Sequence, residues 1–141
     1  MLDILQKFLN LEVKNSKKTL IFPRYHQLDV VRKIIADVKE NGSGRNYLIQ
    51  HSAGSGKSNS IAWTAFRLAS LFDAYNRPVF SSIIIVTDRR NLDSQLQSTG
   101  SGFDHVVDTI AAIDNKKNSG DLRDAINDGV RIIITTLQKY L

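Results

Sequence analysis

A short glycine-rich stretch contains the residues of this sequence whose types and spacing could do chemistry: Ala53-Gly54-Ser55-Gly56-Lys57-Ser58. Its glycines leave room for backbone N–H groups to close around phosphate oxygens at the start of a helix. Lys57, the predicted catalytic residue, can reach the β- and γ-phosphates of a nucleotide, and the Ser58 hydroxyl suits the magnesium ion that bridges them. The stretch therefore predicts a phosphate loop for ATP with magnesium, with Ser52 and Ser55 in lesser roles.

The loop departs from the strict pattern GxxxxGK[ST] at its first position, where the pattern asks for glycine and this sequence has His51. Its second half, residues 54–58, is complete. It also lies between a predicted strand and a predicted helix, which is the context that the motif demands. A GSGK stretch could otherwise be a mere flexible turn, so the flanking elements favour phosphate binding.

Hydrophobic periodicity predicts the elements that must position this loop. Apolar residues recur at helical spacing over residues 25–39, and the NGSG that follows is a strong helix stop. Residues 47–49 form a short apolar run, interpreted as a strand. The pattern over residues 61–72 predicts a long and mostly buried helix. The expected order is therefore strand, glycine loop, helix.

The rest of the chain repeats this alternation. Residues 83–86 are a continuous β-branched run, typical of a parallel strand covered on both faces. A helix over residues 91–97, a strand at 106–107, a helix near 121–126 and a strand over 132–134 follow. Alternating strands and helices predict an α/β fold with a three-layer, right-handed parallel sheet, whose ligands sit at the carboxyl ends of the strands. A helical lead-in over residues 1–18 is expected before the domain at 19–141.

The composition restricts the classes of function. A chain of 141 residues fits one domain, and its net charge of +5 helps attract polyanions without being specific to them. The absence of cysteine excludes disulfides and Cys-rich zinc sites, and three scattered histidines do not suggest a metal-ligand cluster. No apolar run approaches the roughly 18 residues of a membrane span, and no signal peptide is evident, so a cytoplasmic location is expected.

Four segments, in this order and spacing, resemble the first RecA-like motor domain of the R subunit of a type I restriction enzyme, a superfamily 2 helicase-type translocase. They are FPRYHQ at 22–27, QHSAGSGKS at 50–58, VTDRRNLDSQL at 86–96 and TTLQK at 135–139. The resemblance covers nearly the whole chain from about residue 19. The phosphate loop is shared by many ATPases, whereas RYHQ before it and TDRxxLDxQ after it are more specific.

This resemblance implies roles for residues outside the loop. Arg24 and Gln27 would recognise the adenine edge, because a guanidinium and an amide can read its acceptors and amino group. Phe22 or Tyr25 could stack on the base. The alternative makes Gln27 only a polar residue on the solvent face of an amphipathic helix.

The resemblance also implies contacts with DNA phosphates by Thr87, Arg89 and backbone amides at a helix start, which would grip a strand without reading its sequence. The alternative makes Asp88 a helix N-cap and the arginines after it surface charges. Thr135, Thr136 and Gln138 resemble a further motif that grips a DNA strand. The alternative is that they simply end a buried β-strand.

A motor of this kind also needs an acidic pair after an apolar strand and an arginine from across the nucleotide. Asp88 is followed by two arginines and is a poor substitute for such a pair. In the family that the chain resembles, the acidic motif would come after Leu141, so we expect a fragment that is inactive alone. Glu12-Val13-Lys14 superficially resembles the ExK of restriction nucleases, but too little chain precedes it to build that nuclease core.

The implied cofactors are ATP and Mg²⁺. The implied partners are double-stranded DNA, the methylation and specificity subunits of a type I restriction complex, and the remainder of the parent chain. Three alternatives stay open: another superfamily 2 helicase fragment, a small P-loop phosphotransferase, and a nucleic-acid-binding module whose loop no longer works.

Overall fold

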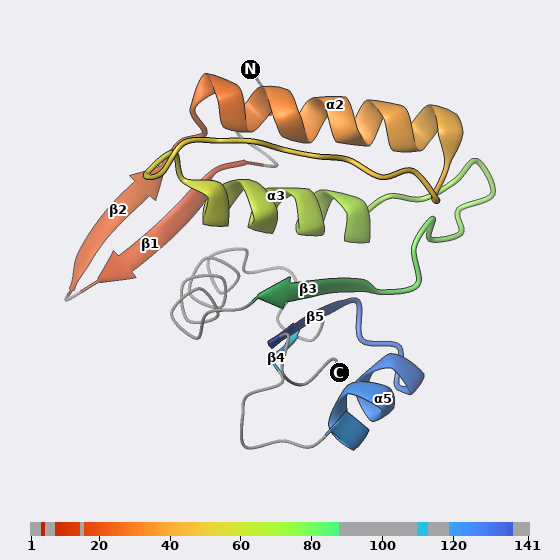
Figure 1. Ribbon diagram of the computed structural model, residues 1–141. Helices are drawn as coiled ribbons and strands as arrows, with labels where there is room; N and C mark the ends of the chain where they lie inside the picture. Colours follow the sequence, from red (N-terminus) through yellow and green to blue (C-terminus); the bar gives the residue numbers. More distant parts are fainter. Residues whose placement is uncertain (1–3, 5–7, 15, 88–109, 113–118, 137–141) are drawn as a thin grey trace.

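The computed structural model describes the chain except for residues 1–3, 5–7, 15, 88–109, 113–118 and 137–141 (Figure 1). The predicted helix at 91–97 and strand at 106–107 lie outside the described residues. The described elements are β1 (Asn10–Lys14), β2 (Lys17–Ile21), α2 (Tyr25–Asn41), α3 (Lys57–Ala69), β3 (Ile83–Thr87), β4 (Ile110–Ala112), α5 (Ser119–Asn127) and β5 (Ile132–Thr136).

Both long helices expected from periodicity are present, but α3 ends at Ala69, so the predicted extension to residue 72 is wrong and Phe72 lies beyond the helix, 49% exposed. Helix α2 begins directly after Arg24 and ends at Asn41, where Gly42 adopts a φ of 72° and donates its N–H to the Val38 carbonyl at 2.9 Å. Glycine takes this positive φ without the steric cost of a Cβ atom. The NGSG stretch therefore stops the helix as predicted.

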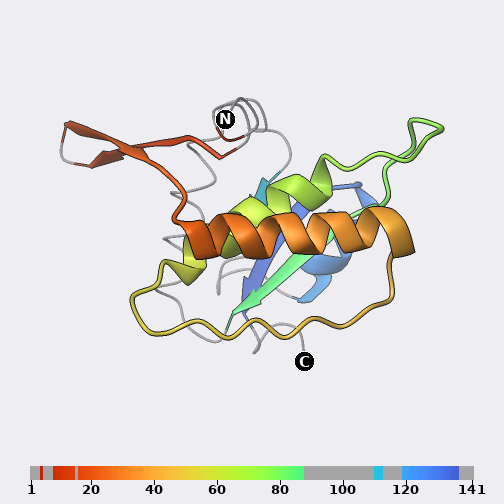
Figure 2. The ribbon, with the colours of Figure 1, turned by 90° about the horizontal axis from the view of Figure 1, so that it is seen from above.

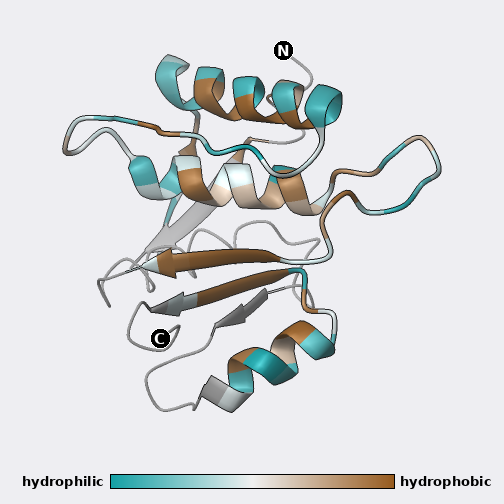
Figure 3. Ribbon diagram, turned by 45° about the vertical axis from the view of Figure 1, so that its right-hand side comes forward, coloured by the Kyte–Doolittle hydropathy of each residue, from teal (hydrophilic) through white to brown (hydrophobic). Residues whose placement is uncertain are grey.

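Two clusters of buried side chains join α2 to α3. Hydrophobic residues lie on the side of α2 that faces α3, while polar residues face outward (Figure 3). Phe8 and Trp63 are fully buried, with ring centroids 6.0 Å apart. The first cluster contains Phe8, Val31, Ile35 and Trp63, and the second contains Ile34, Val38 and Leu71.

Helix α3 contacts the sheet through small side chains. Ala62 packs with Ile134, and Ala65 and Ala69 pack with Ile132. These alanines recur at the spacing that places residues on one helix face. Because their side chains are small, the helix backbone approaches the strands closely, and α3 lies between α2 and the sheet (Figure 1).

The described sheet has three parallel strands in the order β3-β5-β4. Ile83 lies opposite Ile132 and Val86 lies opposite Thr135. The central strand β5 is covered on both faces, since residues 132–134 are at most 3% exposed. Helix α5 lies on the side of the sheet away from α3 (Figure 1). The predicted α/β class, the parallel pairing and the strands at 83–86 and 132–134 are confirmed.

One expected strand is wrong. Residues 47–49 form neither strand nor helix in the segment that joins α2 to the glycine loop. Leu48 is 96% exposed, and no described strand pairs with this segment. A short apolar run becomes a strand only when a neighbouring strand accepts its backbone hydrogen bonds, which the run itself does not specify.

The lead-in expected to be helical contains an antiparallel hairpin in its described part. Asn10 lies opposite Ile21, and Lys14 lies opposite Lys17. Between the strands, Ser16 has a φ of 63°, a value that the short turns of hairpins require. The hairpin projects to one side of the helices (Figure 2). Within the described part of the chain, none of the helices combines the length and apolar character needed to cross a membrane.

Asp37 ties the segment after α2 back to that helix. Its Oδ1 accepts hydrogen bonds from Asn41 Nδ2 at 2.9 Å and from Arg45 Nη1 at 3.2 Å. Its Oδ2 accepts one from the Tyr47 hydroxyl at 2.6 Å. The carboxylate thus fixes the start of the path toward the glycine loop.

This carboxylate makes the titration of Tyr47 testable. The hydrogen bond to Asp37 raises the pKa of Tyr47 above its ordinary value of 10.0, and burial adds to the effect. Because the folded pKa is raised, the stabilisation is present below the ordinary value and is lost as the pH rises through the folded pKa. We expect Asp37→Asn to lower the pKa of Tyr47, measured by phenolate absorbance, with Tyr47→Phe identifying its step. An unchanged titration curve in Asp37→Asn would contradict this assignment.

Candidate phosphate-binding site

The glycine loop lies at the N-terminus of α3, beside the end of the sheet where β3 terminates (Figure 1). Gly56 caps the helix with φ 79° and ψ 36°, and Gly54 has φ 72°. Both values fall in the left-handed region that glycine enters readily. The loop therefore folds as it does because glycine stands at its two turning points, and α3 directs the positive end of its dipole toward it.

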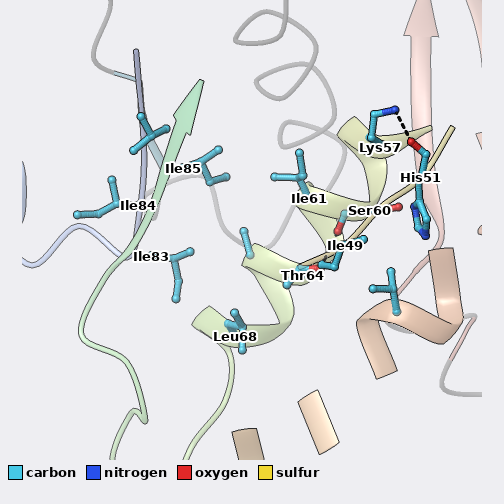
Figure 4. A pocket seen from close by; sticks show the side chains of 13 residues that line it. Ile49, His51, Lys57, Ser60, Ile61, Thr64, Leu68, Ile83, Ile84 and Ile85 are labelled. Atoms are coloured by element: carbon cyan, nitrogen blue, oxygen red, sulfur yellow. Dashed lines mark hydrogen bonds between the residues drawn. The ribbon is translucent and has the colours of Figure 1, made fainter. Parts of the chain in front are cut away.

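The Lys57 ammonium folds back over this loop. Its Nζ donates to the His51 carbonyl at 3.1 Å and to the Ser52 carbonyl at 2.8 Å, and the side chain is exposed (Figure 4). These acceptors are neutral. A phosphate oxygen forms a stronger, charge-assisted hydrogen bond, so an incoming phosphate can take their place.

Several polar groups of the loop have no hydrogen-bond partner among the described residues and could therefore bind an anion. The Ser55 hydroxyl is buried without a hydrogen-bond partner among the described residues, as is His51 Nδ1. The backbone N–H groups of Gly56 and Lys57 donate to no carbonyl of the described residues. Unpaired donors at a helix start are the groups that bind phosphate oxygens, so the loop fits a phosphate ligand.

Ser58 lies half-buried in the first turn of α3, next to Lys57. Within the described ranges, no group of three or more His, Cys, Asp or Glu residues could hold a metal ion. A single hydroxyl together with nucleotide phosphates is a common way to hold Mg²⁺, which keeps several of its waters. The residues present therefore fit a magnesium ion that arrives with a nucleotide.

The structure brings Gln27 to the glycine loop. Gln27 is only 3% exposed; its Oε1 accepts a hydrogen bond from the Arg24 N–H at 2.8 Å, and its Nε2 donates to the Gly56 carbonyl at 2.9 Å. The alternative that placed Gln27 on a solvent face is wrong. Arg24 is exposed, as are Tyr25 at 84% and Phe22 at 53%. Adenine recognition by Arg24 and Gln27 stays a prediction.

His26 is a residue of this site that the sequence did not reveal. Its Nε2 lies 2.9 Å from the Ser55 carbonyl, and its ring meets His51 edge to face, with centroids 4.9 Å apart and an interplanar angle of 89°. The two histidines are far apart in sequence and looked unrelated. The available signals were the position of His26 beside Gln27 and the histidine that stands in place of the first glycine of the loop pattern.

The predicted DNA contacts are only partly described. Thr87 ends β3 and is 6% exposed, and Thr135 lies in β5 and is fully buried. The parallel register places both near the carboxyl ends of adjacent strands. Arg89, Gln138 and the side chain of Thr136 lie outside the described residues. These contacts stay predictions, and the Thr135 hydroxyl would need its surroundings to move before it touched DNA.

An apolar cavity of about 390 Å³ adjoins Lys57 between α3 and β3. Ile61 and Leu68 line it from the helix, Ile83 and Ile85 from the strand, and Ile49 from the segment before the loop (Figure 4). Two side chains of β3, Ile84 and Val86, are 38% and 43% exposed, and one backbone edge of this strand is open within the described part of the chain. No described strand pairs with this edge.

The chain is similar along almost all of its length to a curated protein. It is 31% identical over 146 aligned residues to the type I restriction enzyme HindI endonuclease subunit of Haemophilus influenzae. The alignment covers 99% of this chain but only 13% of the relative. No solved structure matches the chain significantly.

A model of the SWI2/SNF2 ATPase family matches residues 26–141, which include the glycine loop and everything that follows it. Together the two comparisons confirm the prediction that this is part of an ATPase motor similar to a type I restriction enzyme subunit. An ATPase domain uses a nucleotide, as the glycine loop indicates. The chain belongs to the SWI2/SNF2 ATPase family.

Proposed function

We propose that the chain is the nucleotide-binding part of the DNA-translocating motor in the endonuclease subunit of a type I restriction enzyme. The observation that carries the proposal is the glycine loop at the start of α3, where the exposed Lys57 ammonium donates to two neutral carbonyls that a phosphate can replace. In a larger protein similar to the Haemophilus influenzae subunit, ATP hydrolysis at this loop would drive movement along DNA and lead to cleavage.

The nucleotide is ATP with Mg²⁺ in this proposal. The loop from Ser52 to Ser58 binds the phosphates, Lys57 compensates the charge on the β- and γ-phosphates, and the Ser58 hydroxyl holds the ion. Arg24 and Gln27 recognise the adenine. The short distance from Gln27 to the Gly56 carbonyl supports a place for the base beside the start of α2, because it puts the two segments side by side.

Double-stranded DNA is the polymeric partner, contacted through its backbone by Thr87, Arg89 and Thr135. The methylation and specificity subunits and the rest of the parent chain are the protein partners, in the cytoplasm. The meeting of Thr87 and Thr135 at one end of the sheet supports this, since ligands of parallel α/β sheets bind at the carboxyl ends of the strands.

The complete domain is a three-layer, RecA-like sheet with more strands than the described part contains. Parallel sheets are normally covered on both faces, yet Ile84 and Val86 in β3 are well exposed and an apolar cavity lies beneath α3. A further apolar strand beside β3 would bury these side chains. Such a strand is also the position after which a pair of acidic residues could reach the magnesium ion.

We predict that the 141-residue chain alone binds ATP but hydrolyses it negligibly. The sequence offers no adjacent acidic pair after either β3 or β5, so the pair that such a motor uses to hold magnesium and activate water is not expected in these 141 residues. Phosphate release should therefore stay at the background rate, with or without double-stranded DNA. The whole parent protein is the positive control and should hydrolyse ATP faster when DNA is added. Turnover of several per second by the short chain would contradict the proposal.

A further inference from the structure

Two neighbouring side chains at the start of α2 hold two successive carbonyls of the glycine loop. His26 Nε2 lies 2.9 Å from the Ser55 oxygen, and Gln27 Nε2 donates to the Gly56 oxygen at 2.9 Å. A carbonyl oxygen only accepts hydrogen bonds, so Nε2 of His26 must carry the proton. Each contact joins residues 29 positions apart in the sequence.

Holding a carbonyl also orients the N–H on the other side of the peptide. A trans peptide is planar, and its N–H points opposite to its C=O. When the Ser55 oxygen points toward α2, the Gly56 N–H must point away from α2. The same geometry turns the Lys57 N–H away when Gln27 holds the Gly56 oxygen. Both N–H groups are among those that have no carbonyl partner in the described part of the chain.

The two peptides differ in how much they need this help. The Gly56 oxygen also accepts the first hydrogen bond of α3, from the Ser60 N–H at 3.2 Å, so the helix itself fixes that peptide. The Ser55 oxygen precedes the helix and receives no such bond from the described backbone. Glycine adopts φ values of either sign, so the Ser55–Gly56 peptide can flip at little cost. His26 is the side chain that opposes this flip.

The ring of His26 is itself supported. His51 packs against it edge to face, with centroids 4.9 Å apart, an arrangement that aromatic rings favour. His51 occupies the position where the strict loop pattern has glycine. The departure from that pattern therefore supplies the surface on which His26 rests.

We infer that His26 is a positioning residue of the nucleotide site, a role that rests on the proposed nucleotide-binding function. It keeps the Ser55–Gly56 peptide in the orientation that presents the Gly56 N–H to a phosphate, and His51 supports its ring. In this role His26 acts through the Ser55–Gly56 peptide, so its contribution is to binding of the phosphates and not of the base.

The test compares His26→Leu, which removes the donor, with His26→Gln, whose amide nitrogen can reach about the position of Nε2. Affinity is measured with a fluorescent ATP analogue, displaced by ATP or by inorganic tripolyphosphate. His26→Leu should lower the affinity for both competitors about five-fold, which corresponds to one net hydrogen bond of about 1 kcal/mol. His26→Gln should stay within about two-fold of the unmodified chain. The amide NMR signal of Gly56 should move in His26→Leu and return in His26→Gln.

Controls separate this inference from the proposed function. If Lys57→Ala binds the analogue as well as the unmodified chain, the nucleotide-binding function itself is wrong. If Lys57→Ala loses binding while His26→Leu keeps it, the function stands and the role of His26 is wrong. Equal weakening in His26→Leu and His26→Gln, at equal melting temperatures, would also overturn it, because the donor would then be irrelevant.

A second variant covers the case in which His26→Leu does not fold. His51→Ala removes the supporting ring but keeps the backbone carbonyl that Lys57 contacts. It should lower the affinity for tripolyphosphate about two-fold and shift the Gly56 amide signal in the same direction as His26→Leu does. An unchanged affinity together with an unchanged Gly56 signal in His51→Ala would count against the positioning role.

Discussion

Replacing Lys57 with alanine should abolish detectable ATP binding by this chain. The ammonium is the positive charge that the glycine loop itself carries, and it contributes charge-assisted hydrogen bonds to phosphate that alanine cannot make. Two such bonds at about 1.5 kcal/mol or more each correspond to a loss of at least about a hundred-fold in affinity. Titration with a fluorescent ATP analogue, at fixed ionic strength, measures the effect.

A matched control removes the same charge elsewhere. Lys33 lies on the outer face of α2, where it pairs with Asp29 at 2.8 Å and is 76% exposed. Its replacement by alanine should leave nucleotide affinity unchanged, because an exposed ion pair contributes little and lies away from the loop. Equal affinities in Lys57→Ala and the unmodified chain would remove the glycine loop from the assignment. Equal losses in both variants would instead indicate a nonspecific effect of net charge.

The second large effect is expected for Gly56→Ala. A Cβ atom at this position would lie 2.4 Å from Gln27 Nε2, and the φ of 79° is unfavourable for any residue with a side chain. The substitution therefore combines backbone strain of about 1–2 kcal/mol with displacement of a buried, doubly hydrogen-bonded amide. We expect the free energy of unfolding to fall by at least about 2 kcal/mol and ATP affinity to fall with it, measured by urea denaturation and ligand titration.

Gly54→Ala is the matched control for this collision. Gly54 has a similar φ of 72°, but an added Cβ would meet no atom within 4 Å. It should therefore lose only the strain contribution of about 1–2 kcal/mol. Adding Gln27→Ala to Gly56→Ala should recover part of the larger loss, since the collision is then removed. Equal destabilisation by the two glycine variants would show that contact with Gln27 does not matter.

The sequence-based prediction succeeded for helices and strands that are specified by the pattern of their own residues. The periodicity of α2 and the β-branched run of β3 each specify an element, and both elements are confirmed. The expected cover on both faces of β3 is not found among the described residues, since Ile84 and Val86 are 38% and 43% exposed. The run at 47–49 was misleading because a strand needs a partner, and no described strand lies beside it. The glycine loop was predictable because its residue types and spacing are themselves the site.

Contacts between distant segments could not be predicted in the same way. Gln27 is buried because the first turn of α2 packs against the loop before α3, and nothing in the helix pattern specifies that neighbour. The meeting of His26 with His51 and Ser55 has the same origin. A pattern of apolar residues fixes which helix face is buried, whereas the polar contacts at a helix end depend on what the rest of the chain brings there.

No strand of the described part of the chain pairs with the outer edge of β3, which has a consequence for work with the chain in solution. Where such an edge stays open, its N–H and C=O groups can pair with another extended backbone, and residues 83–86 contain neither charge nor proline to discourage such pairing. A second molecule of the chain can supply that backbone. Solubility should therefore depend on concentration, and the mutual repulsion that the net charge of +5 provides will be screened as salt is added.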